Sequence, residues 1–145
     1  MLNYSKYIID AHAHIFPDKI ARKAADNIGH FYDLYMNFDG TADTLIKQGD
    51  ECGVSKFVVQ SVATVPHQVK RINDFIVSAV EKYPDRLIGF GSLHPDMNGM
   101  EEEIDRLISI GLHGIKLHPD FQYFAINDEK ACRIYDAVGD KLPFL

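Results

Sequence analysis

Apolar residues recur along this chain with two different spacings. Short β-branched or aromatic runs alternate with longer stretches in which apolar residues return every three or four positions. The short runs are typical of strands and the longer stretches of helices with one buried face. The clearest helical stretch starts around Val65 and ends at Pro84, with its apolar stripe formed by Val69, Ile72, Ile76, Ala79, Val80 and Tyr83. The pattern therefore predicts regular alternation of strands and helices.

Four short apolar runs predict strands, and a fifth begins where the sequence stops. The first strand leads from Tyr7 to Ile9 into residues 10–14, the next three cover residues 57–61, 87–92 and 114–118, and residues 143–145 open the fifth. The later strands begin roughly 30 residues apart, which is the length of one strand–helix unit. Such alternation predicts a parallel sheet covered by helices.

Capping residues predict where several helices begin and end. Thr41 is predicted to cap a helix that runs to about Cys52 and stops at Gly53. An earlier helix is predicted from Asp18 to Ile28, closed by Gly29. Asn98 and Asn127 are predicted to cap the two helices near the end of the chain.

The segment from His30 to Gly40 is aromatic and irregular, and we expect it to be a loop that folds over another part of the molecule. Its aromatic side chains either line a pocket or pack locally; they are Phe31, Tyr32, Tyr35 and Phe38.

Two architectures fit this order of elements, which we treat as one domain over residues 1–145. One is an open, doubly wound five-stranded sheet. The other is the N-terminal half of a (β/α)8 TIM barrel, with four βα units plus the start of strand five. Periodicity does not separate the two, whereas candidate chemistry does, because residues 12–17 read HAHIFP where a doubly wound domain carries a glycine-rich phosphate loop.

The first predicted strand carries a pair of histidines. Asp10, His12 and His14 alternate along it, and residues two apart in a strand point to the same face. Two neutral imidazoles on one face can occupy adjacent positions around a zinc-like ion. The alternative is two histidines that merely lie close together in a loop, but their place at the end of a strand favours a metal site.

Histidines also follow the other predicted strands. His94 and His118 each end a strand and precede a proline, and His67 lies just beyond the second strand. The carboxyl ends of parallel strands share one rim, where active sites lie. The alternatives are hydrogen bonds to loop backbone for His94 and His118, and a solvated helix start for His67.

Lys116 has the same strand parity as His118, so both side chains are predicted to point into the site. A buried lysine is costly unless it is paired or modified. Lys116 would therefore bind a substrate carboxylate or be carbamylated to bridge two metals; the alternative is a lysine that extends to the rim. Lys116 and His118 are the candidate catalytic residues.

Charge and composition limit the classes of binding partner and the cellular location that we expect for this protein. The net charge is −6, with 21 acidic and 15 basic residues, which argues against nucleic acid and anionic membranes as partners. No apolar run approaches the length of a signal peptide or a membrane span, so we expect a cytoplasmic protein. Cys52 and Cys132 do not form a disulfide framework, and both are predicted to be buried thiols on helices.

Three motifs together resemble the amidohydrolase superfamily, in particular the branch that includes the aminocarboxymuconate-semialdehyde decarboxylases. They are IDAHAHIFP at residues 9–17, DRLIGFG at 85–91 and GIKLHP at 114–119. The resemblance implies a (β/α)8 barrel with a divalent metal, most often zinc, bound by His12 and His14. It also implies a third ligand, a histidine, from strand five, a histidine from strand six and an aspartate from strand eight, which lie past Leu145.

The function expected from the resemblance is a metal-dependent hydrolase, in which a metal-activated water attacks an amide, ester or lactone of a small molecule. A non-oxidative decarboxylase of the same superfamily is the alternative. Because two histidines supply too few ligands for a catalytic zinc, we expect this chain to be incomplete and inactive alone. Unpaired strand edges also favour a homo-oligomer, and a half barrel that only assembles, without catalysis, is the third alternative.

Overall fold

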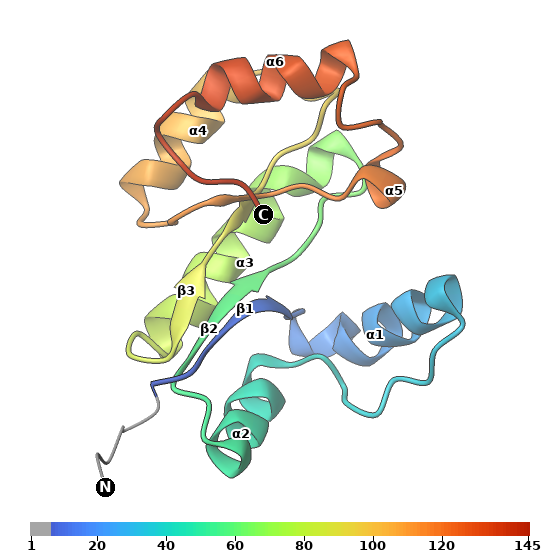
Figure 1. Cartoon of the computed structure of the whole chain (residues 1–145), viewed down its shortest axis with the longest axis vertical. Coiled ribbons are helices and arrows are strands. Elements are labelled where there is room, and N and C mark those ends of the chain that lie inside the picture. The colour runs from blue at the N-terminus through green and yellow to red at the C-terminus, as the bar shows by residue number, and fades with distance from the viewer. Residues whose placement is uncertain (1–6) are drawn as a thin grey trace, which may run out of the picture.

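Parallel strands run through the middle of the fold in the computed structural model, which describes residues 7–145 (Figure 1). Within that range, β1, β2 and β3 form one sheet in that order, and β4 pairs with β5 in a second. Every pair is parallel, as is an isolated bridge between Ile115 and Phe144. The predicted α/β class with parallel strands is confirmed. The strands are β1 (Ile9–His14), β2 (Lys56–Gln60), β3 (Leu87–Gly89), β4 (Gly91–Ser92) and β5 (Ile115–Lys116).

The predicted third strand is divided at Phe90 into β3 and β4. The backbone of this segment forms hydrogen bonds to the chain segments on both sides. The Phe90 amide donates to the Val59 carbonyl at 2.9 Å, and the Gly91 amide donates to the Gly114 carbonyl at 2.8 Å. Gly89 and Gly91 leave room for helix side chains, since a Cβ at either glycine would lie 3.0 Å or less from leucine or isoleucine carbons. The segment therefore joins the two sheets while the covering helices pack directly on its backbone.

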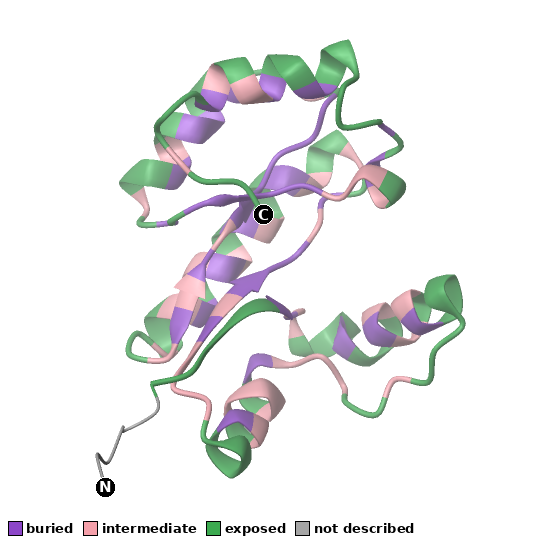
Figure 2. Ribbon diagram, viewed as in Figure 1, coloured by how far each residue is buried: buried purple, intermediate pink, exposed green. Residues whose placement is uncertain are grey.

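Helices cover one side of the strands, with α3 behind them and α4 beside α6 (Figure 1). Burial follows this arrangement, because the buried residues line the strands and the helix faces turned toward them (Figure 2). Ile76, Ile104, Leu107 and Ile134 are fully buried there. The helices are α1 (Asp18–Tyr32), α2 (Ala42–Cys52), the 3-10 helix η1 (Pro66–Gln68), α3 (Val69–Lys82), α4 (Met100–Ser109), α5 (Pro119–Gln122) and α6 (Glu129–Val138).

The ends of α2 are confirmed. The Thr41 hydroxyl accepts a hydrogen bond from the Thr44 amide at 3.2 Å, and Gly53 closes the helix with a φ of 74°. In contrast, α4 and α6 are preceded by Gly99 and Asp128, each one residue later than the predicted cap.

The predicted end of α1 is wrong. The helix continues through Gly29 to Tyr32 and ends at Asp33, whose φ is 54°. Gly29 is needed for a different reason, because a Cβ there would lie 2.5 Å from the Leu34 carbonyl oxygen. The glycine therefore lets the following loop fold back onto the helix, and the aromatic segment begins as helix.

Two further expectations concern the burial of the cysteines and the presence of a membrane-spanning helix. Cys52 and Cys132 lie on helices as predicted, but both are exposed rather than buried. No helix within residues 7–145 combines the length and apolarity needed to cross a membrane.

Candidate metal and substrate site

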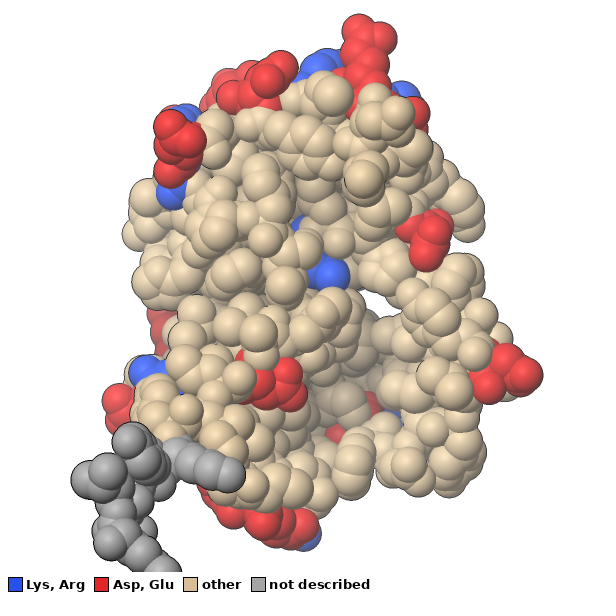
Figure 3. All heavy atoms as spheres, viewed as in Figure 1, with Lys and Arg blue, Asp and Glu red and all other residues tan. Residues whose placement is uncertain are grey.

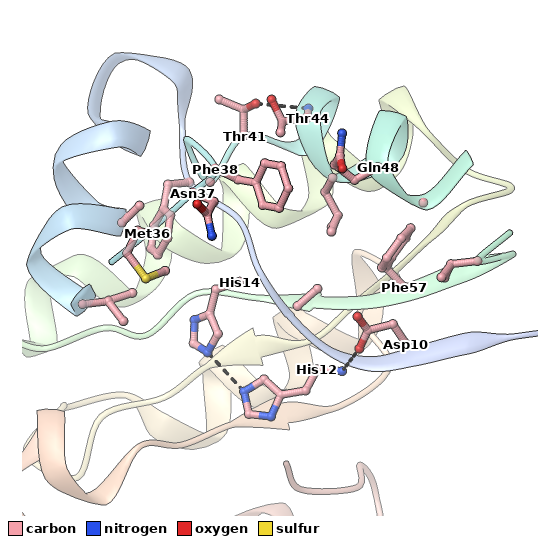
Figure 4. A pocket seen from close by; sticks show the side chains of 18 of the residues that line it. Asp10, His12, His14, Met36, Asn37, Phe38, Thr41, Thr44, Gln48 and Phe57 are labelled. Carbon is pink, nitrogen blue, oxygen red and sulfur yellow. Dashed lines mark hydrogen bonds between the residues drawn. The ribbon is translucent and has the colours of Figure 1, made fainter. Parts of the chain in front are cut away.

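The two histidines of β1 point toward each other (Figure 4). His12 Nε2 lies 3.2 Å from His14 Nε2, while Ala13 and Ile15, at the alternate positions, are buried on the opposite face. The Asp10 carboxylate accepts a hydrogen bond from the His12 backbone amide at 2.9 Å. Strand parity therefore brings both imidazoles to one side, as the spacing predicted.

The separation of the two imidazole nitrogens fits one shared metal ion. Metal–nitrogen bonds of about 2.0–2.1 Å at a tetrahedral angle place two ligand nitrogens roughly 3.3 Å apart, close to the 3.2 Å between His12 Nε2 and His14 Nε2. Within residues 7–145, no cluster of three or more histidine, cysteine or acidic side chains has the arrangement of a metal site. Among the described residues, the candidate metal ligands are therefore this pair of histidines.

Lys116 lies beside this pair on β5. Its side chain is only 5% exposed, and Nζ lies 3.4 Å from His12 Nε2. None of the ion pairs among residues 7–145 involves Lys116. Burial lowers the pKa of this ammonium group, because water no longer stabilises its charge. An unpaired buried cation is a favourable partner for an anion that enters the site.

Burial and neighbouring positive charge keep the histidines neutral. Burial, the Lys116 charge and the two other histidines lower the pKa of His14 to about 4. Burial and Lys116 also lower the pKa of His12, against a smaller opposing effect of Asp10. Neutral imidazoles retain the lone pair that a metal requires, so both side chains are suited to coordination at neutral pH.

Gln60 is a buried polar residue beside His14 that sequence reasoning missed. It pairs in register with His14 across β1 and β2 and is fully buried. Neither atom of its side-chain amide has a hydrogen-bond partner among residues 7–145. Native buried amides nearly always find a partner in protein, water or ligand. The only signal in the sequence is a polar residue at the end of an apolar strand.

His118 lies on the same rim and contacts α1. Its Nδ1 accepts a hydrogen bond from the Phe121 amide at 3.4 Å, and its Nε2 lies 3.1 Å from the Tyr32 hydroxyl. The imidazole stacks on the Phe121 ring at 4.1 Å. Burial and the Lys116 charge lower the pKa of His118. His118 thus uses both ring nitrogens within the protein.

Gln122 ties together the loops that follow three strands. Its buried amide nitrogen donates to the carbonyls of Ala63 at 2.9 Å and Leu93 at 2.6 Å. Its amide oxygen accepts from the His118 backbone amide at 2.8 Å. Sequence reasoning missed this residue, although its position one helical turn after His118 was a usable signal.

A cleft of about 740 Å³ contains the histidine pair. His118 and three of the four aromatic residues singled out from the sequence also line it, whereas Phe31 lines an adjoining groove of about 640 Å³. Figure 3 shows one face of the molecule, on which the basic atoms near the middle are surrounded by uncharged atoms. The aromatic lining residues of the cleft are Phe16, Tyr32, Tyr35, Phe38, Phe57 and Phe121.

The other two rim histidines are not among the residues that line the cleft. His94 is buried, and its Nδ1 accepts a hydrogen bond from the Asp96 amide at 3.1 Å, which is the loop role weighed as its alternative. His67 is exposed on η1. The structure therefore brings together His12, His14 and His118.

Comparison of structures found proteins with the same fold, whereas comparison of sequences found no related family or curated protein. No protein-family model matches the chain, and no curated protein is significantly similar in sequence. A 5-carboxyvanillate decarboxylase from Novosphingobium aromaticivorans, solved with manganese and 4-hydroxy-3-methoxy-5-nitrobenzoic acid, is 20% identical with a TM-score of 0.72. The match covers 97% of this chain and 50% of the decarboxylase.

Two further solved structures have a similar fold. A probable 2-pyrone-4,6-dicarboxylic acid hydrolase from Acinetobacter baumannii, with bound citric acid, is 22% identical with a TM-score of 0.57, covering 92% of this chain and 46% of the hydrolase. An amidohydrolase II is 14% identical with a TM-score of 0.65, covering 90% and 46%. The chain spans about half the length of these proteins, and it has the fold of the half that it matches.

Proposed function

We propose that this chain forms the N-terminal half of a (β/α)8 barrel hydrolase of the amidohydrolase superfamily, with His12 and His14 as metal ligands. The observation that carries the proposal is the 3.2 Å separation of their Nε2 atoms on one face of β1. The strand order supports a barrel, because neighbouring strands are consecutive in sequence, whereas a doubly wound sheet reverses its order at a switch point.

A divalent metal suits this pair of ligands. The manganese in the structure of the 5-carboxyvanillate decarboxylase supports a divalent ion, and paired imidazoles favour zinc, which we propose as the native metal. Such an ion would polarise a substrate carbonyl and activate a water molecule.

Lys116 is proposed to bind a carboxylate of the substrate. Its buried ammonium group lies 3.4 Å from His12 Nε2 and lacks an acidic partner among the described residues. A carboxylate paired with Lys116 would therefore lie directly beside the metal ligands. Lys116 is not itself among the residues that line the cleft, but its contact His12 is, and the aromatic walls of the cleft suit a flat ring. We propose an amide, ester or lactone of a small carboxylated molecule as the substrate.

Non-oxidative decarboxylation is the second candidate function. It is favoured by Lys116, because Nζ lies 3.4 Å from His12 Nε2 and would hold a carboxylate beside the proposed metal ligands. Product analysis distinguishes the two, because hydrolysis incorporates oxygen from labelled water into the product and decarboxylation releases carbon dioxide.

Further strands are proposed to complete the site, since the chain spans about half the length of the solved structures it matches. We propose a homo-oligomer in which a second copy supplies them. Light scattering at micromolar concentration tests this assembly, and a monodisperse monomer would contradict it. A stable oligomer without metal binding or turnover would instead favour the non-catalytic assembly module.

Calorimetric titration with zinc tests the metal site. We expect the wild-type chain to bind zinc, and the His12→Ala/His14→Ala double variant to lose at least tenfold in affinity, because no alternative histidine lines the strand. The His67→Ala variant is the control, since His67 is exposed and outside the cleft. A wild-type chain that does not bind zinc, or a double variant with unchanged affinity, would contradict the metal assignment.

A further inference from the structure

His118 has a defined tautomer in this structure. Its Nδ1 accepts a hydrogen bond from the Phe121 backbone amide, and a nitrogen that accepts in this way carries no proton. The ring proton of a neutral imidazole must then lie on Nε2. Nε2 faces the Tyr32 hydroxyl at 3.1 Å. His118 is therefore the donor in this hydrogen bond, and the Tyr32 oxygen is the acceptor.

The hydroxyl proton of Tyr32 consequently remains available. Its oxygen accepts from His118, and no second hydrogen bond from this hydroxyl is formed within residues 7–145. Tyr32 is 45% exposed and lines the same cleft as His12 and His14. A ligand oxygen in the cleft is the natural acceptor for this proton.

Aromatic contacts fix the position of the Tyr32 ring. Phe31 meets it edge-on at 4.8 Å between ring centroids, and Phe121 lies 6.1 Å away. Phe31 also packs edge-on against Phe121 at 4.7 Å, and the His118 imidazole stacks on the Phe121 ring. These contacts join α1 to α5 across the rim. The hydroxyl is thus preorganised, which lowers the entropic cost of contacting a ligand.

We propose that Tyr32 contacts the substrate and donates a hydrogen bond from its hydroxyl group to a ligand oxygen. His118 is the positioning residue that orients this hydroxyl group. The substrate part rests on the proposed function, because it requires a carboxylated ligand in the cleft. The orientation of the pair is independent of that function. The assignment changes the predicted role of His118 from a group that reacts with substrate to one that acts through Tyr32.

Substitutions that preserve the rings isolate the hydroxyl. Tyr32→Phe retains the aromatic stack but removes the donor, and Tyr123→Phe removes a phenolic hydroxyl at a residue that is 90% exposed and is not among the residues that line the cleft. With zinc present and benzoate as the probe, we expect Tyr32→Phe to weaken binding about threefold to tenfold, as the loss of one hydrogen bond predicts. We expect Tyr123→Phe to change the benzoate affinity less than twofold.

The role of His118 is tested by spectroscopy and by a double variant. Nitrogen-15 chemical shifts of the imidazole should show a protonated Nε2 and an unprotonated Nδ1. His118→Phe should weaken benzoate binding about as much as Tyr32→Phe, and the double variant should be no worse than either single variant, because both remove the same interaction.

Each outcome decides between the two proposals. Equal benzoate affinity in the wild type and Tyr32→Phe, together with weaker binding in Lys116→Met, would overturn the Tyr32 contact while supporting the proposed function. A proton on Nδ1 of His118 would overturn the positioning role. A wild-type chain that binds neither zinc nor benzoate would overturn the proposed function and the Tyr32 contact, and the nitrogen shifts would still decide the orientation of the pair.

Discussion

The two faces of the parallel strands have opposite chemistry, although they alternate residue by residue. The face under the helices is apolar, with Ala13, Val59 and Ile115 each 6% exposed or less. The other face presents His12 and Lys116, which are polar and closely spaced. The first face stabilises the fold by removing apolar surface from water, and the second places polar groups where they cost stability and can bind ligands. This division predicts opposite effects of substitution on the two faces.

The largest loss of stability is expected on the helix-covered face. Ile76 is fully buried on α3 and lies against Gly89 of β3. We expect Ile76→Ala to lower the free energy of unfolding by about 2–5 kcal/mol, because it creates a cavity beneath the strand. Urea denaturation measures the change. Ile126→Ala is the control, since Ile126 is 71% exposed, and its effect should stay within about 0.5 kcal/mol. Equal losses in both variants would contradict the assignment of this core.

The division of residues between the two faces could be predicted from the sequence, because the spacing of side chains along helices and strands is periodic. Apolar spacing identified the stripe of α3, and strand parity placed His12 and His14 on one side of β1. Parity also placed Lys116 on the same face as His118, and Lys116 Nζ lies 3.4 Å from His12 Nε2. These inferences use only the local geometry of helices and strands, which a single sequence encodes directly.

Contacts between distant residues could not be predicted in this way. Tyr32 and His118 are 86 positions apart, and Gln122 contacts loops that follow other strands. The extension of α1 beyond Gly29 has the same cause, since a close approach of the following loop, rather than a helix stop, requires that glycine. Tertiary packing decides these features, and periodicity carries no information about it.

At the rim, Gln122 should stabilise the fold through polar contacts. Gln122→Leu would remove the hydrogen bonds to the carbonyls of Ala63 and Leu93 and to the amide of His118, and the Leu93 carbonyl would keep only a 3.4 Å contact with the Ser92 hydroxyl. We expect a loss of about 2–4 kcal/mol in the free energy of unfolding, because unpaired buried backbone groups cost about 1–3 kcal/mol each and some will gain water. Chemical denaturation tests this expectation. A loss below about 0.5 kcal/mol would show that the three loops do not depend on this amide.

Substitution of Lys116 is expected to raise the free energy of unfolding, whereas substitution of Gln122 lowers it. Burial holds its folded-state pKa below the ordinary value of 10.5, so the unfolded chain binds the proton more tightly and stability rises with pH toward 10.5. At pH 7 and without metal, Lys116→Met should raise the free energy of unfolding by about 1–2 kcal/mol, since it removes a buried charge that has no acidic partner among residues 7–145. This gain should shrink as the pH approaches 10.5. Lys47→Met, at an exposed site on α2, should change stability by less than about 0.5 kcal/mol at either pH. A destabilised Lys116→Met would show that the contact with His12 Nε2 outweighs the cost of burying the charge.

The smallest change in the free energy of unfolding is expected at Gln60. This change distinguishes Gln60 from Gln122, which is also buried. Both side chains are 3% exposed or less, but the amide of Gln122 is fully engaged and neither amide atom of Gln60 has a partner among the described residues. Replacing an unsatisfied amide with an apolar group of similar size removes a desolvation cost rather than a hydrogen bond. Gln60→Leu should therefore change the free energy of unfolding of the metal-free chain by less than about 1 kcal/mol, with stabilisation as the expected direction. A loss as large as that of Gln122→Leu would mean that Gln60 does bind a partner, such as an ordered water, and that the polar face contributes to stability as the helix-covered face does.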